Sequence, residues 1–355
     1  MSIPRTMLAA VFAGEGKLDV VERPTPAPSA DQVLIKIEVC GVCGTDIRFL
    51  SVPPILMARP GVILGHEYVG EVVEVGAGVK HLQPGDRVAI MPDVPCGYCR
   101  SCLRGRPNLC ENVMSVGGDV DGGFAQYAVN PARALIKVPR SIPTDEAAFI
   151  ELLSCVSAGV EKAAPMPGES VVIFGAGPAG MTYMKLFKAA SAGQIIVVEP
   201  SPWRADFALK AGATRAINPR TGDVGQTVRH LTGDGADIIV DAVGVALDAA
   251  IACAGRGARI IVFGEDARAQ CTVRPYDIQH RELRILGSFI GPYHFPKAIQ
   301  MLESGAVRLS DLVTHRLSLR ELPAGIKELA TGQGCKGICL LRTDYTIAAP
   351  RGQPA

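Results

Sequence analysis

The distribution of apolar residues divides the chain into two unlike parts. In the first ~150 residues, short stretches alternate apolar and polar positions, which is typical of strands with one buried face. Residues 33–39 follow this pattern, residues 69–75 form a second β-rich run, and residues 87–90 follow a Pro-Gly turn. Because Gly and Pro recur between these short runs, the pattern predicts a small antiparallel barrel or sandwich.

From about residue 168, short continuous apolar runs alternate with helix-like stretches. The apolar runs are residues 171–174, 195–198, 238–240, 260–263 and 283–286, and the helix-like stretches are residues 179–190, 202–211, 224–231 and 245–253. Continuous apolar strands are buried on both faces, as in a parallel sheet. One doubly wound α/β domain is therefore predicted to about residue 288. An amphipathic helix near 297–302 and a strand near 337–341 are expected to return to the first part.

Composition narrows the class of protein. With 355 residues the chain is long enough for about two domains. Apolar residues make up 48% and charged residues 20%, so a packed core is expected rather than disorder. The net charge is +1 and only 5% of residues are aromatic, so no nucleic-acid partner is expected. No apolar run reaches about 18 residues, so no membrane partner or membrane helix is expected.

Cysteine use indicates metal ligation. The N-terminal residues lack the apolar stretch of a secretory signal, which predicts a cytoplasmic protein whose eleven cysteines stay reduced. Four of them, Cys96, Cys99, Cys102 and Cys110, lie within fifteen residues in a stretch broken by Gly and Pro. Four thiolates can surround one tetrahedral ion and leave no position for substrate, so a structural zinc site is predicted. A disulfide pairing and an iron site are the less favoured alternatives.

A glycine-rich loop follows the first apolar run of the second part. The loop reads Gly175-Ala176-Gly177-Pro178-Ala179-Gly180 and leads into a helix-like stretch. The first glycine permits the tight turn, the second lets a pyrophosphate approach the backbone, and the third lets the helix pack on the strand. Exposed amides at the helix N-terminus would then bind the phosphates. This context predicts a dinucleotide site.

The second apolar run ends at Glu199, nineteen residues after Gly180. A carboxylate there would accept hydrogen bonds from the adenosine ribose and repel a 2′-phosphate, which favours NAD over NADP. Arg204 lies five residues further on and is a cation that a 2′-phosphate would attract. We therefore predict NAD, with NADP as the alternative.

A second set of metal-ligating residues is dispersed along the chain. Cys43 precedes Gly44 in a glycine-rich stretch, His66 and Glu67 follow a Pro-Gly turn, and Glu151 lies among apolar residues. Spacing alone does not bring these residues into one site. From the residues themselves, a buried histidine in the core remains as good an interpretation as a metal ligand.

These motifs together resemble the zinc-containing medium-chain dehydrogenase/reductase superfamily, over about residues 7–341. The resemblance rests on the order and spacing of Cys43-Gly44-x-Asp46, Gly65-His66-Glu67, the four-cysteine stretch and the glycine loop. It implies a GroES-like β-rich catalytic domain at 1–155 with a structural zinc lobe at about 94–112. It also implies a Rossmann domain with a six-stranded parallel sheet at 156–290, and a segment at 291–355 that returns to the catalytic domain.

The resemblance also implies a catalytic zinc in the cleft between the domains. Carried over from the family, Cys43 and His66 are ligands, Glu67 is a ligand or lies beside the metal, and Glu151 is the exchangeable fourth ligand. An acid at the Glu151 position is typical of the polyol and threonine dehydrogenase-like branch, and residues 312–316 resemble the sorbitol dehydrogenases. Zinc would stabilise an alkoxide, from which nicotinamide would accept hydride.

Further roles follow from the resemblance. Thr45 is expected either to pass the substrate proton outward or to cap a local turn, and Asp46 to orient a ligand. The family commonly has histidine where this chain has Arg48, and a guanidinium cannot accept a proton. We therefore hypothesise that Arg48 anchors a cofactor phosphate or a substrate oxygen.

One departure bears on the substrate. Where sorbitol enzymes place a substrate-binding arginine, this chain has Ile290. A shorter diol or a different polyol is therefore expected, with Tyr293 or His294 either contacting its oxygens or lying at the surface.

The leading hypothesis is a dehydrogenase with two zinc ions per chain that transfers a hydride from a secondary hydroxyl of a polyol or related small alcohol to NAD. An L-threonine or butanediol-type dehydrogenase is the alternative, with Arg48 as the cation available to a substrate carboxylate. A non-catalytic cofactor-binding relative is the third hypothesis. The polyol branch implies a homo-oligomer, either a tetramer or a dimer.

Overall fold

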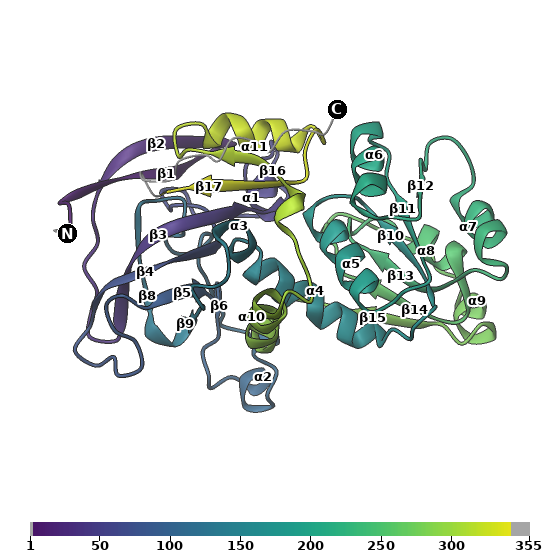
Figure 1. Cartoon of the computed structure of the whole chain (residues 1–355), viewed down its shortest axis with the longest axis horizontal. Helices are drawn as coiled ribbons and strands as arrows, with labels where there is room; N and C mark the ends of the chain where they lie inside the picture. The colour runs from purple at the N-terminus through teal and green to yellow at the C-terminus, as the bar shows by residue number, and fades with distance from the viewer. Residues whose placement is uncertain (1–2, 342–355) are drawn as a thin grey trace.

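The computed structural model describes residues 3–341 and has two halves with unlike architecture (Figure 1). One half is built on a seven-stranded, mostly antiparallel sheet of order β16-β17-β3-β4-β5-β9, with β8 also paired to β3. The strands are β3 (Gln32–Val42), β4 (Glu67–Val75), β5 (Arg87–Ile90), β8 (Tyr127–Pro131), β9 (Leu135–Lys137), β16 (Val313–Leu317) and β17 (Lys336–Leu340). Strands β1 (Thr6–Gly14) and β2 (Lys17–Pro24) form a separate antiparallel hairpin.

Strand β3 follows the predicted alternation except at one position. Lys36 and Glu38 are partly exposed between buried neighbours, as expected, but Leu34 is as inaccessible as Val33 and Ile35. Leu34 is covered because it belongs to an apolar cluster that includes Phe12 of β1 and Ile63. A second covering layer cannot be read from the period of a single strand.

The other half contains a six-stranded parallel sheet, as predicted. Its order is β12-β11-β10-β13-β14-β15, the doubly wound arrangement whose crossovers reverse between β10 and β13. The strands are β10 (Ser170–Phe174), β11 (Gln194–Val198), β12 (Arg215–Ile217), β13 (Ala236–Asp241), β14 (Ala254–Val262) and β15 (Arg284–Gly287). The flanking helices are α5 (Pro178–Ala189), α6 (Pro202–Ala211), α7 (Val224–Thr232), α8 (Leu247–Cys253) and α9 (Pro275–His280).

Helix α4 (Ile150–Ala163) runs from the first half into the second (Figure 1). Phe149, which precedes the helix, and the buried residues of α4 belong to one core. The same core includes Val39 and Val69 from one sheet and Val171 and Ile173 from the other. The predicted boundary at residue 155 falls inside this continuous helix. The two halves therefore share α4 as a common packing element.

The chain returns to the first sheet after the parallel sheet, as expected. Helix α10 (Phe295–Ser304) packs against α4, and α11 (Leu322–Ala330) precedes β17. Strand β17 pairs antiparallel with β3, with Cys339 opposite Cys40. The part of the predicted C-terminal segment beyond residue 341 lies outside the described residues.

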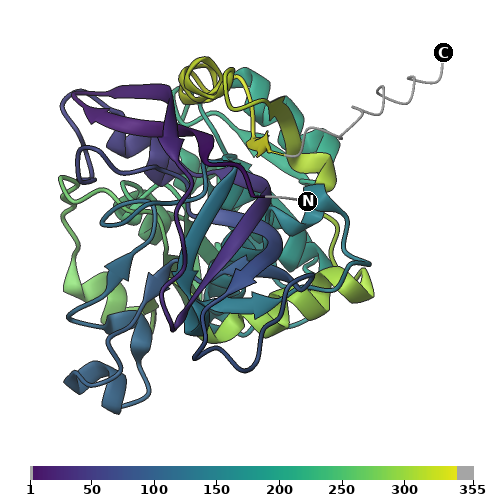
Figure 2. The ribbon, with the colours of Figure 1, turned by 90° about the vertical axis from the view of Figure 1, so that its left-hand side faces the viewer.

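A small lobe projects from one corner of the first half (Figure 2). It contains the two-residue strands β6 (Asp93–Val94) and β7 (Met114–Ser115), helix α2 (Arg100–Leu103) and the 3-10 turn η1 (Pro107–Leu109).

The remaining elements are α1 (Gly44–Phe49), α3 (Thr144–Ala147), and the 3-10 turns η2 (Ala132–Ala134), η3 (Pro292–His294) and η4 (Ser310–Leu312). Over residues 3–341, the helices are too short or too polar to span a bilayer.

Candidate active site

Cys43, His66 and Glu67 converge although the sequence separates them. Cys43 is the residue before α1, and His66 and Glu67 lie at the start of β4. One ligand atom from each lies within 4.8 Å of those of the other two. The Cys43 N–H donates to Asp46 Oδ2 at 2.9 Å, which fixes the first turn of α1 and with it the thiol.

This cluster has the donor set and the unmet bonding capacity of a metal site. A thiolate, an imidazole and a carboxylate are the ligands that zinc prefers. Glu67 Oε1 is buried and has no hydrogen-bond partner among the described residues, a state that a native interior rarely tolerates. Asp46 Oδ1 lies 3.8 Å from His66 Nδ1 and also has no hydrogen-bond partner among the described residues, so its role in orienting a ligand stays a prediction. The residues present therefore fit a zinc ion.

Charges around His66 favour its protonated form in the absence of metal. Burial would lower the pKa of His66, but the neighbouring Cys43 thiolate and the Asp46 carboxylate raise it well above its usual value. Metal binding must therefore displace a proton from this ring.

Glu151 does not join the three-residue cluster. It lies in the first turn of α4, lines the same cleft, and accepts a hydrogen bond from the Cys155 thiol at 3.2 Å. Burial and the nearby Glu67 carboxylate raise the pKa of Glu151 to about 7. The structure thus brings together three of the four predicted ligands and holds Glu151 in the adjoining wall.

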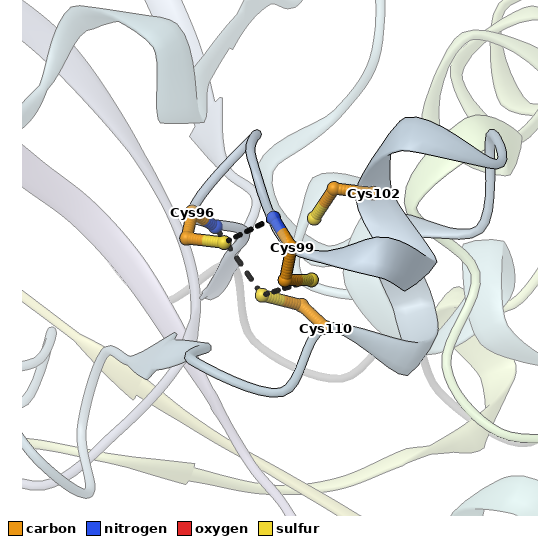
Figure 3. Close-up of side chains that lie close together, drawn as sticks. All are labelled: Cys96, Cys99, Cys102 and Cys110. Carbon is orange, nitrogen blue, oxygen red and sulfur yellow. Dashed lines mark hydrogen bonds between the residues drawn. The ribbon is translucent and has the colours of Figure 1, made fainter.

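The four cysteines of the lobe point their sulfur atoms toward a common centre (Figure 3). Their sulfur atoms all lie within 4.8 Å of one another. Backbone amides already donate to two of them: Cys99 N–H to Cys96 Sγ at 3.3 Å, and Cys96 N–H to Cys110 Sγ at 3.3 Å. Amide donors from Cys102 and Glu111 lower the pKa of Cys99 to about 6. Four sulfur atoms in this arrangement fit a four-coordinate zinc ion.

The glycine loop has the close contacts that the motif requires. Gly175 has a φ of +98°, and a Cβ at Gly180 would lie 1.9 Å from the Gly175 carbonyl oxygen. Pro178 and Ala179 open helix α5, so free amides at its N-terminus face the cleft. These contacts explain why glycine stands at both positions.

Glu199 follows β11 and braces the glycine loop. Its Oε2 accepts from Ala176 N–H and its Oε1 from Ser201 N–H, both at 2.8 Å. A carboxylate has about four acceptor positions, so capacity remains for a ribose hydroxyl. Arg204, in contrast, donates to main-chain carbonyls of the C-terminal segment, to Gly334 O at 2.9 Å and Leu329 O at 3.4 Å.

A cleft of about 660 Å³ joins the metal cluster to the glycine loop. Thr45 and Arg48 line it from α1, and the Thr45 hydroxyl lies 3.6 Å from Cys43 Sγ. The charge of Arg48 helps to lower the pKa of Asp266 from the second half, after the dominant hydrogen bonds from Arg268. Arg48 therefore lies in the same cleft as the glycine loop.

Ile290 lies in the cleft, but the two nearby residues considered as contacts for substrate oxygens do not. Ile290 lines the cleft with a φ of +39°, a costly conformation for a β-branched residue. Tyr293 and His294 are absent from the lining. Tyr293 is exposed, and His294 Nδ1 lies 3.1 Å from Ser157 Oγ.

Comparison with known proteins agrees with this geometry. Residues 29–140 match the alcohol dehydrogenase GroES-like domain, and residues 178–304 match the zinc-binding dehydrogenase domain. The sorbitol dehydrogenase of Bacillus subtilis is 34% identical over 327 residues, which cover 90% of this chain and 92% of that protein. The chain belongs to the zinc-containing medium-chain dehydrogenase/reductase superfamily.

Other members are similar over most of the enzyme's length. D-arabinitol dehydrogenase 1 of Uromyces fabae is 31% identical over 94% of this chain and 97% of its own. L-threonine 3-dehydrogenase of Pyrococcus furiosus is 39% identical over 69% of this chain and 72% of its own. These relatives assign the enzyme to the polyol and threonine branch of the superfamily.

Solved structures agree in fold. A zinc-binding dehydrogenase from Sinorhizobium meliloti 1021, solved with NADP, superposes with a TM-score of 0.88 at 32% identity, covering 94% of this chain and 99% of that one. RspB of Escherichia coli CFT073, solved with NADH, gives 0.87 at 29% identity, covering 95% and 100%. The enzyme is thus an oxidoreductase of the alcohol dehydrogenase type.

Two residues of the site escaped the sequence analysis. Lys336 is completely buried, and its ammonium donates to Glu67 Oε2 and, at 3.2 Å, to Val42 O. Asp93 lines the cleft beside Glu151, and burial raises its pKa. An isolated lysine or aspartate is usually a surface residue, so no sequence signal marked either position.

Proposed function

We propose that the enzyme oxidises a secondary hydroxyl of a polyol or related small alcohol with NAD as hydride acceptor. The observation that carries this proposal is the shared cleft. The cluster of Cys43, His66 and Glu67 and the glycine loop both line this cleft. An alcohol bound at the cluster can therefore meet a dinucleotide bound at the loop. Holding two reactants in this way supplies much of the rate enhancement in bimolecular reactions.

Each residue of the cleft has a definite task in this proposal. Cys43, His66 and Glu67 would hold zinc, with Glu151 available beside them, and zinc supplies Lewis-acid stabilisation of the substrate oxygen. Thr45, whose hydroxyl lies 3.6 Å from Cys43 Sγ, would accept the substrate hydroxyl proton at Oγ1 and pass its own proton to solvent in the cleft. Gly175, Gly177 and Gly180 would hold the dinucleotide phosphates, together with Pro178 and Ala179 of α5.

We propose NAD rather than NADP on the basis of Glu199. Its buried carboxylate can accept from a ribose hydroxyl and would repel a 2′-phosphate. The Nε and Nη2 donors of Arg204 are engaged with carbonyls, which leaves less of its guanidinium for a phosphate. Relatives with NADP and with NADH are both known, so this choice depends on the two residues alone.

The substrate class follows from charge. Asp93, Glu151 and Glu265 line the cleft, and its arginines are Arg48 of α1 and Arg204, whose Nε and Nη2 already donate to carbonyl oxygens. Carboxylates accept hydrogen bonds from hydroxyls and repel anions, so a neutral polyol is favoured. L-Threonine is the second candidate, with Arg48 facing its carboxylate and Asp93 its ammonium group.

The test is NADH formation by zinc-replete enzyme with matched substrates: a polyol series, 2,3-butanediol, 2-butanol and L-threonine. We expect polyols or diols to exceed 2-butanol in kcat/KM, and Asp93→Asn to reduce that advantage about 10- to 100-fold, the value of one hydrogen bond to a charged group. Cys43→Ser should abolish turnover, whereas Glu74→Gln, at an exposed carboxylate, should not change it. Equal turnover by the Cys43→Ser variant would refute the proposal.

We further propose a cytoplasmic homo-oligomer. The eleven cysteines are free in the part of the chain that the structure describes, which suits a reducing compartment. Strand β15 is at one edge of the parallel sheet, and exposed Phe289 follows it, which offers a surface for a second copy. Light scattering of the purified enzyme would distinguish a dimer or tetramer from a monomer.

A further inference from the structure

Arg204 lies where the two halves meet at the glycine-loop end of the cleft. Its Nε–H donates to Gly334 O at 2.9 Å and its Nη2 to Leu329 O at 3.4 Å. From the preceding turn, Ser201 Oγ donates to Gly332 O at 3.2 Å. All three acceptors belong to the end of α11 and the loop that leads into β17. One short stretch of α6 therefore fixes this loop to the parallel-sheet half.

The same guanidinium approaches the dinucleotide site. A Cβ at Gly177 would lie 4.0 Å from Arg204 Nη1, and Nη1 donates no hydrogen bond within residues 3–341. An arginine carries five N–H donors in a fixed plane. Nη1 can therefore donate to a cofactor bound on the glycine loop while Nε and Nη2 remain hydrogen-bonded to the carbonyl oxygens of Gly334 and Leu329.

The loop held by Arg204 leads directly to the metal cluster. Two residues after Gly334, the Lys336 ammonium donates to Glu67 Oε2 in a fully buried ion pair. Phe149 covers this ammonium at 5.5 Å from its ring centre. Residues 334–336 are thus tied at one end beside the cofactor loop and at the other to a candidate zinc ligand.

We propose that Arg204 is a positioning residue that couples occupancy of the dinucleotide site to retention of zinc at Cys43, His66 and Glu67. The proposal rests on the proposed function for the identity of the two ligands. When the dinucleotide engages Nη1, it restricts Arg204 and therefore residues 334–336, which keeps Lys336 and Glu67 in place. Such coupling is reciprocal for binding at equilibrium. Zinc must raise the affinity for the dinucleotide by the same factor as the dinucleotide raises the affinity for zinc.

The experiment measures zinc release to a chromophoric chelator from the holoenzyme, with and without saturating NADH. Release of zinc from the cluster is the kinetic phase that the Cys43→Ser variant lacks. This comparison separates it from release of the zinc in the four-cysteine lobe. We expect NADH to slow this phase at least about fivefold in the wild type, the lower end of typical coupling. In Arg204→Ala at saturating NADH the slowing should disappear. The matched control is Arg256→Ala, at an exposed arginine of the same half, and it should behave as wild type.

Two further measurements keep the proposal falsifiable. Arg204→Lys keeps the charge but cannot bridge both carbonyls, so it should show an intermediate slowing and covers the case in which the alanine variant does not fold. Hydrogen exchange of amides 332–336 should slow on addition of NADH in the wild type and not in Arg204→Ala. NADH-independent zinc release in the wild type, or full coupling in Arg204→Ala, would overturn the proposal.

These measurements contain no alcohol. Failure of every alcohol in the substrate panel would therefore refute the proposed substrate class and leave the coupling experiment interpretable. Zinc release that does not depend on NADH in a wild-type enzyme with normal turnover would refute the role of Arg204 and leave the proposed reaction standing.

Discussion

Lys336 and Glu67 form an ion pair across the end of strand β3, and neither side chain is accessible to solvent. Gly41 of β3 makes room for it, because a Cβ there would lie 2.2 Å from Glu67 Oε2 and 3.0 Å from Lys336 Nζ. Burial would lower the pKa of Lys336, but the Glu67 and Cys43 charges raise it instead. The ammonium therefore remains charged and offsets the negative charge of the cluster.

Removing one partner should be costly. In the zinc-free state, Lys336→Met would leave the buried Glu67 carboxylate without its ammonium partner, which lowers the free energy of unfolding by about 3–5 kcal/mol. Urea unfolding measures this loss. The double variant Lys336→Met/Glu67→Gln should recover much of it, and Lys336→Arg should lose less than Lys336→Met. Equal stability of the Met variant and the wild type would contradict the pairing.

Glu151 should make the metal-free site sensitive to pH. Its pKa of about 7 lies above the usual 4.5, so the folded protein binds the extra proton between these values. The stabilisation is complete below pH 4.5 and is lost as the pH rises through 7, in total about 3 kcal/mol at 1.36 kcal/mol per pKa unit. Urea unfolding of Cys43→Ser between pH 5 and 8 tests this. The double variant Cys43→Ser/Glu151→Gln should lose less free energy of unfolding over the same range. Parallel pH profiles of the single and double variants would exclude Glu151 as the source of the pH dependence.

The four-cysteine lobe should depend on its metal. Cys102→Ser would remove one of four ligands, and we expect zinc content to fall by one ion per chain, as measured by mass spectrometry under native conditions. Protease cleavage within residues 94–112 should then increase, because among residues 95–112 only Cys99 is buried and the lobe has little apolar core of its own. Cys271→Ser, at an exposed cysteine outside both clusters, is the control. Unchanged zinc content in Cys102→Ser would contradict the assignment.

Glu199 should set the choice of dinucleotide. Glu199→Ala removes the acceptor for the ribose and the charge that repels a 2′-phosphate. We expect kcat/KM with NAD to fall about 10- to 100-fold, the value of a hydrogen bond to a charged group, and the NADP to NAD ratio to rise. Asp206→Ala, at an exposed acid of the following helix α6, controls for the change in net charge. An unchanged ratio would show that other residues select the cofactor.

Much of the fold could be predicted from local pattern. The runs at 171–174 and 195–198 became β10 and β11, because strands buried on both faces leave continuous apolar sequence. Strand β12 was missed because it has three residues and begins with exposed Arg215. Helix α4 was missed because its residues are buried nearly all round, which removes the periodicity that marks a helix.

The site could be predicted only where a motif carried it. The glycine loop and the four cysteines are local in sequence, so their geometry follows from spacing. Cys43 and His66 needed the family resemblance, because strand pairing rather than spacing brings them together. Lys336 and Asp93 carry no motif, and their roles depend on burial that only the tertiary structure supplies.

The pairing of β17 with β3 also constrains biosynthesis. Glu67 and the strand beside it leave the ribosome 269 residues before Lys336, whereas the strands of the parallel sheet lie close together in the chain. Contacts of such long separation form late, and segments emerging during translation fold as units when their contacts are local. The nucleotide-binding half can therefore fold while translation continues, but the metal-binding half is completed only after its last strand has emerged. A ribosome that stops between residues 290 and 336 would release a folded nucleotide-binding half attached to an unfinished metal-binding half.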